Sequence, residues 1–322
     1  MLSYDWLKMV AVVVAIVFVW VLAFTIGAPR ATTGQTFGVF YFHGGNFKYS
    51  TEAAELSANM KKEGVFSYDV LDFNVREIGE NYSEILLTST SVQEGDVMIT
   101  IDHPAKIETF NSPFRMLMDG YGEVFYDYND LIKDAKEYCL KNKFVYKSGE
   151  VYLLDENKIQ SYFETRMDGD PRFRDEESQR YKDGIQSEIE RIKMVWNNAI
   201  MLEDCLSAHP EIKYSYVRYT QSVEADSSAD GSEILSQQTE KLYGINLGKL
   251  TGGSSIITTD FYYNIVDENN NVTDSSADGI VLCVYDFYAY QPHLQFETLG
   301  FVNSIISKYS NFLNTALPQL IS

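Results

Sequence analysis

Residues 37–46 have the sequence FGVFYFHGGN, and this stretch decides the predicted fold. Phenylalanine, valine and tyrosine favour strands, and a short apolar run bounded by turn residues is typical of a buried strand. The pair Gly44 and Gly45 then turns the chain. A helix is predicted at 51–62, with acidic residues in its first turn and Gly64 just past its end. The pattern therefore indicates a strand joined to a helix by a short loop.

The same alternation continues to residue 101. Residues 68–73 are the second predicted strand, residues 81–91 a second helix, and residues 96–101, DVMITI, a third strand. Strands that alternate with helices through short connections pair in parallel, with right-handed crossovers. The predicted fold class is therefore α/β, with a mainly parallel open sheet.

Helices and strands also alternate in the rest of the chain. An apolar stripe with helical period runs through residues 157–208, and Pro210 ends it. The other predicted elements are a helix at 130–142, strands at 151–154, near Tyr214 to Val217, at 255–266 and at 280–288, and a final amphipathic helix that opens at Pro292. The second half is thus predicted to be α/β as well.

Upstream of the first strand, residues 9–28 read MVAVVVAIVFVWVLAFTIGA and carry no charge. At about 1.5 Å per helical residue this segment is roughly 30 Å long, which matches the hydrocarbon core of a bilayer. We expect one transmembrane helix here, with residues 1–8 as a short cytoplasmic tail and residues 29–35 as a linker. A cleaved signal peptide and a buried core helix are the alternatives; the first has a shorter apolar run of about 7–15 residues.

The flanking charges give a weak orientation signal. Lys8 precedes the apolar segment and Arg30 follows it, which is close to a tie under the positive-inside rule. Long domains cross a membrane largely regardless of their charge. We therefore expect a single-pass protein of the cell membrane whose C-terminal domain is extracytoplasmic.

Composition disfavours several classes of function. The net charge of −20 makes nucleic acid an unfavourable partner. The three cysteines are widely spaced and form no CxxC pair, so neither a zinc site nor a redox centre is predicted. The chain also lacks GxSxG, HExxH, GxxxxGK and GxGxxG motifs. We accordingly predict no catalytic residues, no metal and no cofactor, and a protein that is not an enzyme.

The ends of the predicted strands supply a candidate ligand site. In open α/β sheets, ligands bind in the crevice outside the carboxyl ends of the strands. Polar residues and glycines follow the three predicted strands, and we expect them to converge there. The residues are His43, Gly44, Gly45, Asn46, Asn74, Asp102 and His103. Two histidines without a third ligand or a base do not define a metal or catalytic site, so the predicted role is ligand binding.

Two further features have a functional and a structural interpretation. Tyr288 and Tyr290 share one face of an aromatic segment and are candidates for stacking on a sugar ring, whereas core packing is the common use of such residues. Residues 267–278 place oxygen-bearing side chains with the spacing of a calcium loop. Val272 stands where that loop needs glycine, and Asp278 where it needs a glutamate. A polar hairpin tip is the better interpretation.

The segment 86–101, LLTSTSVQEGDVMITI, resembles the first lobe of extracellular solute-binding proteins of ABC sugar importers, as do TFGVFYFHGG at 36–45 and YGINL at 243–247. The resemblance implies a two-lobed, periplasmic-binding-protein-like fold, with residues 36–150 as the first α/β lobe and 151–322 as the second. It also implies a carbohydrate or other small solute as ligand and a membrane transporter as partner. The chain departs from that family in its short length, its scarce tryptophan and its lack of a lipid-modified cysteine. These departures are typical of a degenerate relative.

The sequence therefore predicts a membrane-anchored extracytoplasmic binding protein, held by lipid through residues 9–28. It would act as a solute-binding-like receptor or as an accessory subunit of an ABC-type sugar transporter. One alternative is a structural or assembly partner of a membrane complex with no small ligand. Another is a redox-inactive thioredoxin-like domain, since a strand such as FGVFYF followed by a helix opens that fold and no cysteine follows it here.

Overall fold

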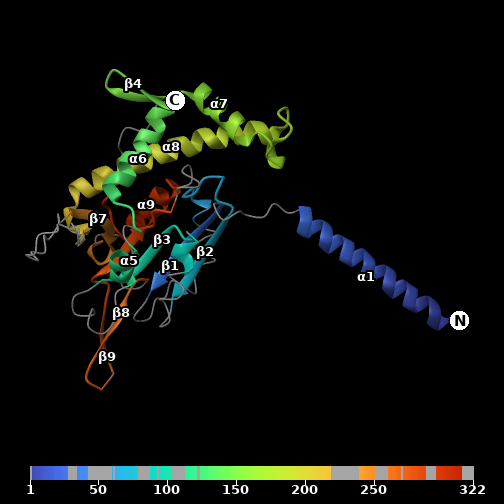
Figure 1. Cartoon of the computed structure of the whole chain (residues 1–322), viewed down its shortest axis with the longest axis horizontal. Coiled ribbons are helices and arrows are strands. Elements are labelled where there is room, and N and C mark those ends of the chain that lie inside the picture. Colours follow the sequence, from blue (N-terminus) through green and yellow to red (C-terminus); the bar gives the residue numbers. More distant parts are fainter. Residues whose placement is uncertain are drawn as a thin grey trace, which may run out of the picture.

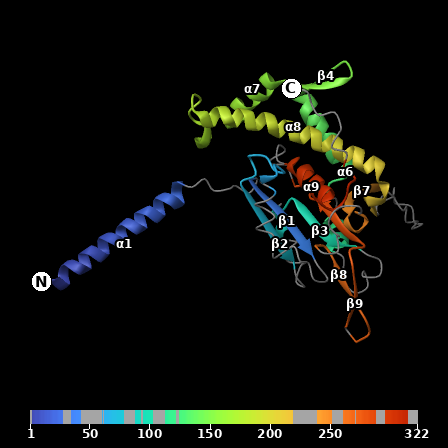
Figure 2. The same cartoon turned by 180° about the vertical axis from the view of Figure 1, so that it is seen from behind.

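A central sheet with helices on both faces forms the body of the protein, and one N-terminal helix stands apart from it (Figure 1; Figure 2). The computed structural model describes residues 2–27, 35–42, 60, 62–78, 88–92, 94–102, 113–121, 124–218, 239–250, 260–269, 271–287 and 295–313. The predicted helices at 51–62 and 81–91 lie largely outside the described residues, and so does the start of the strand predicted at 255–266.

Six strands make up the main sheet. In spatial order they are β2 (Asp72–Ile78), β1 (Thr36–Phe42), β3 (Val97–Ile101), β10 (Ile280–Val284), β7 (Thr239–Asn246) and β6 (Lys213–Arg218). β1 pairs in parallel with β2 and with β3, whereas β10, β7 and β6 follow one another in antiparallel pairing from β3 onward. The sheet is therefore mixed, and the prediction of a mainly parallel sheet is wrong.

The prediction is wrong because the sequence of β10 does not indicate the direction of the strand. Every residue of this strand is buried, because helices and loops cover both faces of the sheet at its centre. A strand buried on both sides shows a continuous apolar run in either direction, so the pattern IVLCV carries no information about whether it runs parallel or antiparallel to its neighbour.

The remaining elements cover or extend this sheet. The helices are α1 (Leu2–Gly27), α5 (Pro113–Tyr121), α6 (Tyr128–Lys141), α7 (Glu156–Met167), α8 (Gln179–Ala208) and α9 (Glu297–Tyr309), with short 3₁₀ turns η2 (Pro171–Phe173), η3 (Pro210–Ile212) and η4 (Leu247–Lys249). Two hairpins, β4 (Val145–Ser148) with β5 (Val151–Leu154) and β8 (Tyr263–Val266) with β9 (Val272–Ser276), project from the body (Figure 1).

Alternating side chains of the central strands fill two cores. Val39 and Tyr41 of β1 belong to a large cluster that also contains buried residues of α6, α8 and α9. Phe40 between them and Met98 of β3 pack on the opposite face with residues of α5. The large cluster also joins residues from both predicted lobes, and β3 pairs directly with β10. The two-lobed fold class is therefore corrected to a single sheet with a shared core.

Helix α8 forms where its sequence pattern predicts. Ser178 caps its first turn, because the Ser178 side chain accepts a hydrogen bond from the Tyr181 N–H at 3.2 Å. The predicted stripe is buried from Ile189 to Leu206, and the helix ends before Pro210. α8 thus crosses the top of the sheet and packs against α6, α7 and α9 (Figure 1).

A buried ionic network, here called the Glu188 network, fixes α7 and α8 to the segment before β2. Arg166 of α7 contacts the carboxylate of Asp69 at 2.6 Å and that of Glu188 at 2.8 Å. Arg191 binds the other oxygen of Glu188 at 2.8 Å, and the Tyr68 hydroxyl donates to Glu188 at 2.9 Å. Charges this deeply buried need such partners, so the network fixes the position of α7.

The N-terminal segment requires a second correction. Residues 9–27 of the apolar segment belong to helix α1, and Ala28 lies outside the described residues. The large apolar side chains that the structure describes on α1, among them Trp6, Val14 and Phe18, are exposed. Among the described residues, no helix has both the length and the apolarity needed to cross a bilayer. The transmembrane helix in the predicted fold class is therefore not supported.

Candidate functional site

Only part of the predicted ligand site can be located. The structure describes Asn74 and Asp102. The other predicted residues, His43, Gly44, Gly45, Asn46, His103, Tyr288 and Tyr290, lie outside the described residues.

Asn74 does not lie at the carboxyl end of a strand. It is exposed in the middle of β2, where it pairs with Gly38 of β1. The predicted strand at 68–73 starts and ends too early, because β2 is an edge strand whose exposed polar residues interrupt the apolar pattern. The structure therefore does not bring Asn74 together with Asp102.

Asp102 lies where the sequence predicts, directly after β3. Its backbone N–H donates to the carbonyl of Gly279 at 2.8 Å, which fixes the residue against the start of β10. Its carboxylate accepts two hydrogen bonds from Arg115 of α5, from Nε at 2.8 Å and from Nη2 at 3.3 Å. The hydroxyl of Tyr214 on β6 also donates to this carboxylate. Asp102 thus joins three elements that are far apart in the sequence.

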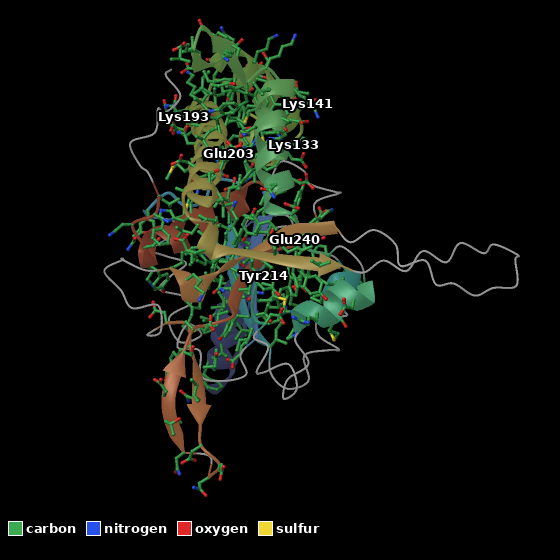
Figure 3. The ribbon with its side chains drawn as sticks, turned by 90° about the vertical axis from the view of Figure 1, so that its left-hand side faces the viewer. Lys133, Lys141, Lys193, Glu203, Tyr214 and Glu240 are labelled. Carbon is green, nitrogen blue, oxygen red and sulfur yellow. The ribbon has the colours of Figure 1, made fainter. Side chains whose placement is uncertain are left out.

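Aromatic residues complete this group. The Tyr216 hydroxyl donates to Asp119 at 3.0 Å, and the Arg115 guanidinium lies 5.6 Å from the centre of the Tyr216 ring. Phe114 presents its ring to Tyr214 and Tyr216 in edge contacts with centroid distances of 5.3 and 5.1 Å. We call Asp102, Arg115, Asp119, Tyr214 and Tyr216 the Asp102 cluster. In Figure 3, Tyr214 lies at the sheet, below the helices that carry Lys133, Lys141, Lys193 and Glu203.

The charge states in the cluster follow from its contacts. The hydrogen bonds from Arg115 to Asp102 raise the pKa of the guanidinium, so it stays charged. Burial, together with the neighbouring Asp102 carboxylate, raises the pKa of Tyr214. Burial and the Asp119 hydrogen bond raise the pKa of Tyr216 to about 12. Both tyrosines therefore remain neutral hydrogen-bond donors near pH 7.

Sequence reasoning missed four members of the cluster. Arg115 and Asp119 lie on a short helix in a segment for which we predicted no element, and no charge motif points to them. Tyr214 and Tyr216 alternate along a predicted strand, but their position beside Asp102 depends on pairing between β6 and β7. β7 was not predicted, so no signal in the sequence linked these residues.

Cysteine and metal chemistry find no support in the described residues. Cys139, Cys205 and Cys283 are free and buried, and burial raises the pKa of Cys139 to about 12 and that of Cys205 to about 11. Such thiols are poor nucleophiles. In the part of the chain that the structure describes, no three His, Cys, Asp or Glu side chains are placed to hold a metal ion.

The predicted hairpin tip has its own hydrogen bonds. The Asp267 carboxylate accepts from the backbone N–H groups of Asn269 and Asn271, both at 2.8 Å. These bonds lower the pKa of Asp267. Asp267 closes the turn between β8 and β9. The predicted tip at 267–278 is thus only partly correct, because its residues 272–276 form strand β9.

Comparisons of the chain with protein-family models, with curated proteins and with solved structures gave no match. The fold and the site thus define an α/β protein with a polar cluster beside the carboxyl end of a parallel strand. The resemblance to solute-binding proteins stays a prediction.

Proposed function

We propose that this chain is a binding protein and that the Asp102 cluster takes a polar solute, with carbohydrate as the leading class. The observation that carries the proposal is the pair formed by Asp102 and Arg115. The Asp102 side chain is 1% exposed, whereas the Arg115 side chain is 39% exposed. A buried carboxylate therefore holds a solvent-accessible guanidinium beside the carboxyl end of β3, the edge at which open α/β sheets bind ligands.

The side chains of the cluster suit a neutral polyol. The guanidinium is a rigid planar donor, and its hydrogen bonds to Asp102 fix its direction before a ligand arrives, which reduces the entropy lost on binding. Asp119 adds acceptor oxygens, and the ring of Tyr216 adds an apolar face of the kind that packs on a sugar ring. Since neither tyrosine titrates near pH 7, these groups favour binding over acid–base catalysis.

A thermal-shift screen of the full chain against an oligosaccharide panel tests this proposal. We expect one class of saccharide to raise the midpoint of unfolding, and Arg115→Gln to abolish that rise. Arg76→Gln is the matched control, because Arg76 is 42% exposed and pairs with Glu94 at 3.3 Å away from the cluster. Comparing each variant with and without saccharide removes any change in its own stability. An equal rise in both variants, or no rise with any saccharide, would contradict the proposal.

We also propose that residues 9–28 contact membrane lipid and hold the domain on the extracytoplasmic side, beside a transporter. The exposed apolar side chains of α1 support this, since Val14 is 61% exposed and Phe18 is 64% exposed. Covering such side chains with lipid is favourable by about 25 cal/mol per Å². In a liposome flotation assay, the full chain should float, and Val14→Asp with Phe18→Asp should not. Leu140→Asp, at an exposed apolar residue of α6, is the control.

The same exposed side chains favour a second candidate, an assembly partner of a membrane complex without a small ligand. An apolar helix surface can pack on another helix as well as on lipid. Crosslinking with mass spectrometry on intact cells discriminates the two candidates. Crosslinks from α1 to one integral membrane protein, combined with no saccharide response, would favour the assembly role. Protease digestion of the same cells tests the side of the membrane, and a protected domain would contradict the extracytoplasmic placement.

A further inference from the structure

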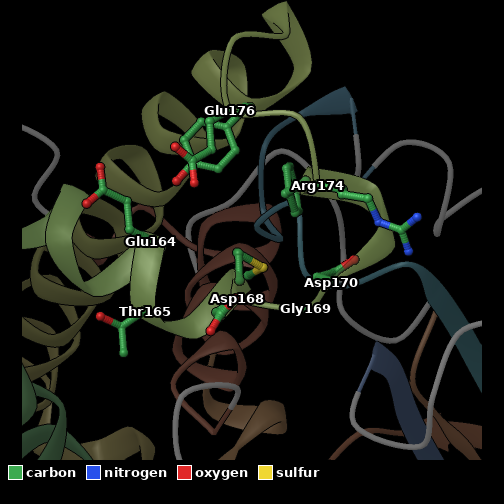
Figure 4. A pocket seen from close by; sticks show the side chains of 10 residues that line it. Glu164, Thr165, Asp168, Gly169, Asp170, Arg174 and Glu176 are labelled. Atoms are coloured by element: carbon green, nitrogen blue, oxygen red, sulfur yellow. The ribbon is translucent and has the colours of Figure 1, made fainter.

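A cleft of about 650 Å³ opens between the end of α7, the η2 turn and the first turn of α8 (Figure 4). We call it the α7–α8 cleft. Its volume lies within the range of about 300–1,000 Å³ that is usual for small-molecule sites. The cleft lies far from the Asp102 cluster. The Glu188 network joins α7 to the segment before β2, whereas Asp102 follows β3. Because β2 and β3 run in the same direction on either side of β1, the two sites lie toward opposite ends of these strands.

The rim of the cleft is negative. Glu164, Asp168, Asp170 and Glu176 line it together with one cation, Arg174. Arg172 neutralises Asp170 through an ion pair of 2.8 Å. Asp168 and Glu176 form no ion pair with any residue that the structure describes, and Figure 4 shows the Arg174 guanidinium pointing away from Glu176.

The end of α7 adds to this negative field. The C-terminus of a helix carries a partial negative charge on its unpaired carbonyl groups, and a basic residue in the last turn usually offsets it. The basic residue here is Arg166, whose guanidinium instead contacts the buried carboxylates of Asp69 and Glu188. Arg166 is therefore engaged in the interior and does not neutralise the cleft.

Aromatic rings form the floor of the cleft. Phe173 and Tyr181 line it, with exposed fractions of only 7% and 8%. Phe163 holds both from behind through edge contacts, with centroid distances of 5.2 Å to Phe173 and 5.5 Å to Tyr181. The Arg172 guanidinium already lies 5.3 Å from the centre of the Phe173 ring, so the floor adds mainly apolar contact for the alkyl groups of an organic cation. The floor and the rim therefore favour the same kind of ligand.

We propose that the α7–α8 cleft binds a small organic ammonium ion. The carboxylates of the rim attract its charge, and Phe173 and Tyr181 pack on its alkyl groups. A bare inorganic cation fits less well, because it requires several oxygen ligands converging within about 2.6 Å. Among the described residues, no group of three or more acidic side chains is placed in that way.

Calorimetric titration of the full chain with choline and with spermidine tests this site. We expect one of these cations to bind with a stoichiometry of one in buffer of physiological ionic strength. The neutral isostere of choline, 3,3-dimethylbutanol, should bind at least about tenfold more weakly because it lacks the charge. Asp168→Asn combined with Glu176→Gln should weaken cation binding by about tenfold or more, and Phe173→Leu by about three- to tenfold.

The matched control is Glu190→Gln combined with Glu203→Gln, two exposed α8 carboxylates outside the cleft, which removes the same charge. This control should retain the affinity of the unmodified chain. Failure of both cations to bind, equal binding of the neutral isostere, or unchanged affinity in the Asp168 and Glu176 variant would each overturn the proposal. Calcium binding that the cleft variant abolishes, without organic cation binding, would overturn it as well. Loss of saccharide response in Arg115→Gln is independent of all these outcomes.

Discussion

At the scale of single residues, the side chain of Glu297 stands out because it is a buried acid at the start of α9. One carboxylate oxygen accepts a hydrogen bond from the Ser67 N–H at 3.0 Å, whereas Oε1 has no hydrogen-bond partner among the described residues. Burial raises the pKa of Glu297, and the nearby Asp69 raises it further; the Ser67 bond and Arg191 lower it but do not reverse the shift. Ionising this carboxyl in the folded protein is therefore unfavourable.

The pH dependence of stability follows from that shift. A carboxyl whose pKa is raised by folding holds its proton more tightly in the folded state, so the protein loses stability as pH rises above the ordinary value of 4.5 and through the folded pKa. Glu297→Gln removes this titration. We expect the free energy of unfolding of the variant, relative to the unmodified chain, to increase from pH 4 to pH 8 in urea titrations. A difference that is independent of pH would contradict the assignment.

At the scale of elements, the packing of α8 against its neighbours, rather than helix propensity, explains the glycine at position 184. This residue is buried within a 30-residue helix, where glycine is intrinsically unfavourable. A Cβ atom at this position would lie 2.6 Å from the ring of Phe163 and 2.7 Å from that of Phe173. Two rings held by edge contacts cannot both move aside, so the glycine allows α7, η2 and α8 to approach closely.

We therefore expect Gly184→Ala to destabilise the protein although alanine is the better helix former. Overpacking costs about 1–3 kcal/mol, and the propensity gain offsets about 1 kcal/mol of that, which leaves a net loss of roughly 1 kcal/mol. Urea unfolding measures the difference. Gln186→Ala, at an exposed position of the same helix, should change stability by less than about 0.5 kcal/mol. A stabilised Gly184→Ala variant would show that the rings relax.

At the scale of the whole molecule, one core joins the two halves of the chain. β3 from the first half pairs with β10 from the second, and α6, α8 and α9 pack over both. Cys139 on α6, Cys205 on α8 and Cys283 on β10 are all buried in this body. A body with a continuous core of this kind is expected to unfold as one cooperative unit.

Thiol labelling at increasing urea concentrations tests whether the body unfolds as one cooperative unit. We expect Cys139, Cys205 and Cys283 to become reactive at the same urea concentration, because each is exposed only on global unfolding. Labelling followed by peptide mass spectrometry separates the three sites. If Cys139 and Cys205 reacted at a lower urea concentration than Cys283, the helical layer would unfold separately from the sheet.

Individual helices and strands were predicted better than their pairing, because their formation depends mainly on residues that are close in the sequence. The structure confirms two predicted strands, at 37–42 (β1) and at 151–154 (β5). It also confirms the predicted helix at 130–142 (α6) and the helical segment at 157–208, which forms α7 and α8 with a break around η2. β7 was missed because its sequence, TEKLYGIN, mixes charged residues, glycine and apolar residues without a clean alternation. The predicted strand at 68–73 begins and ends several residues before β2, because the exposed polar residues of this edge strand interrupt its apolar pattern.

The sequence by itself determined the α/β class, the buried central strands, the apolar stripe of α8 and the position of Asp102 after a strand, because periodicity is a local property. Only the tertiary structure decided the antiparallel placement of β10, the packing of both halves of the chain around one sheet, and the contacts of Asp102 with Arg115 and Tyr214. Strand direction and long-range hydrogen bonds depend on pairing between distant segments. A strand buried on both faces has the same composition in either direction, so its pattern cannot specify its neighbours.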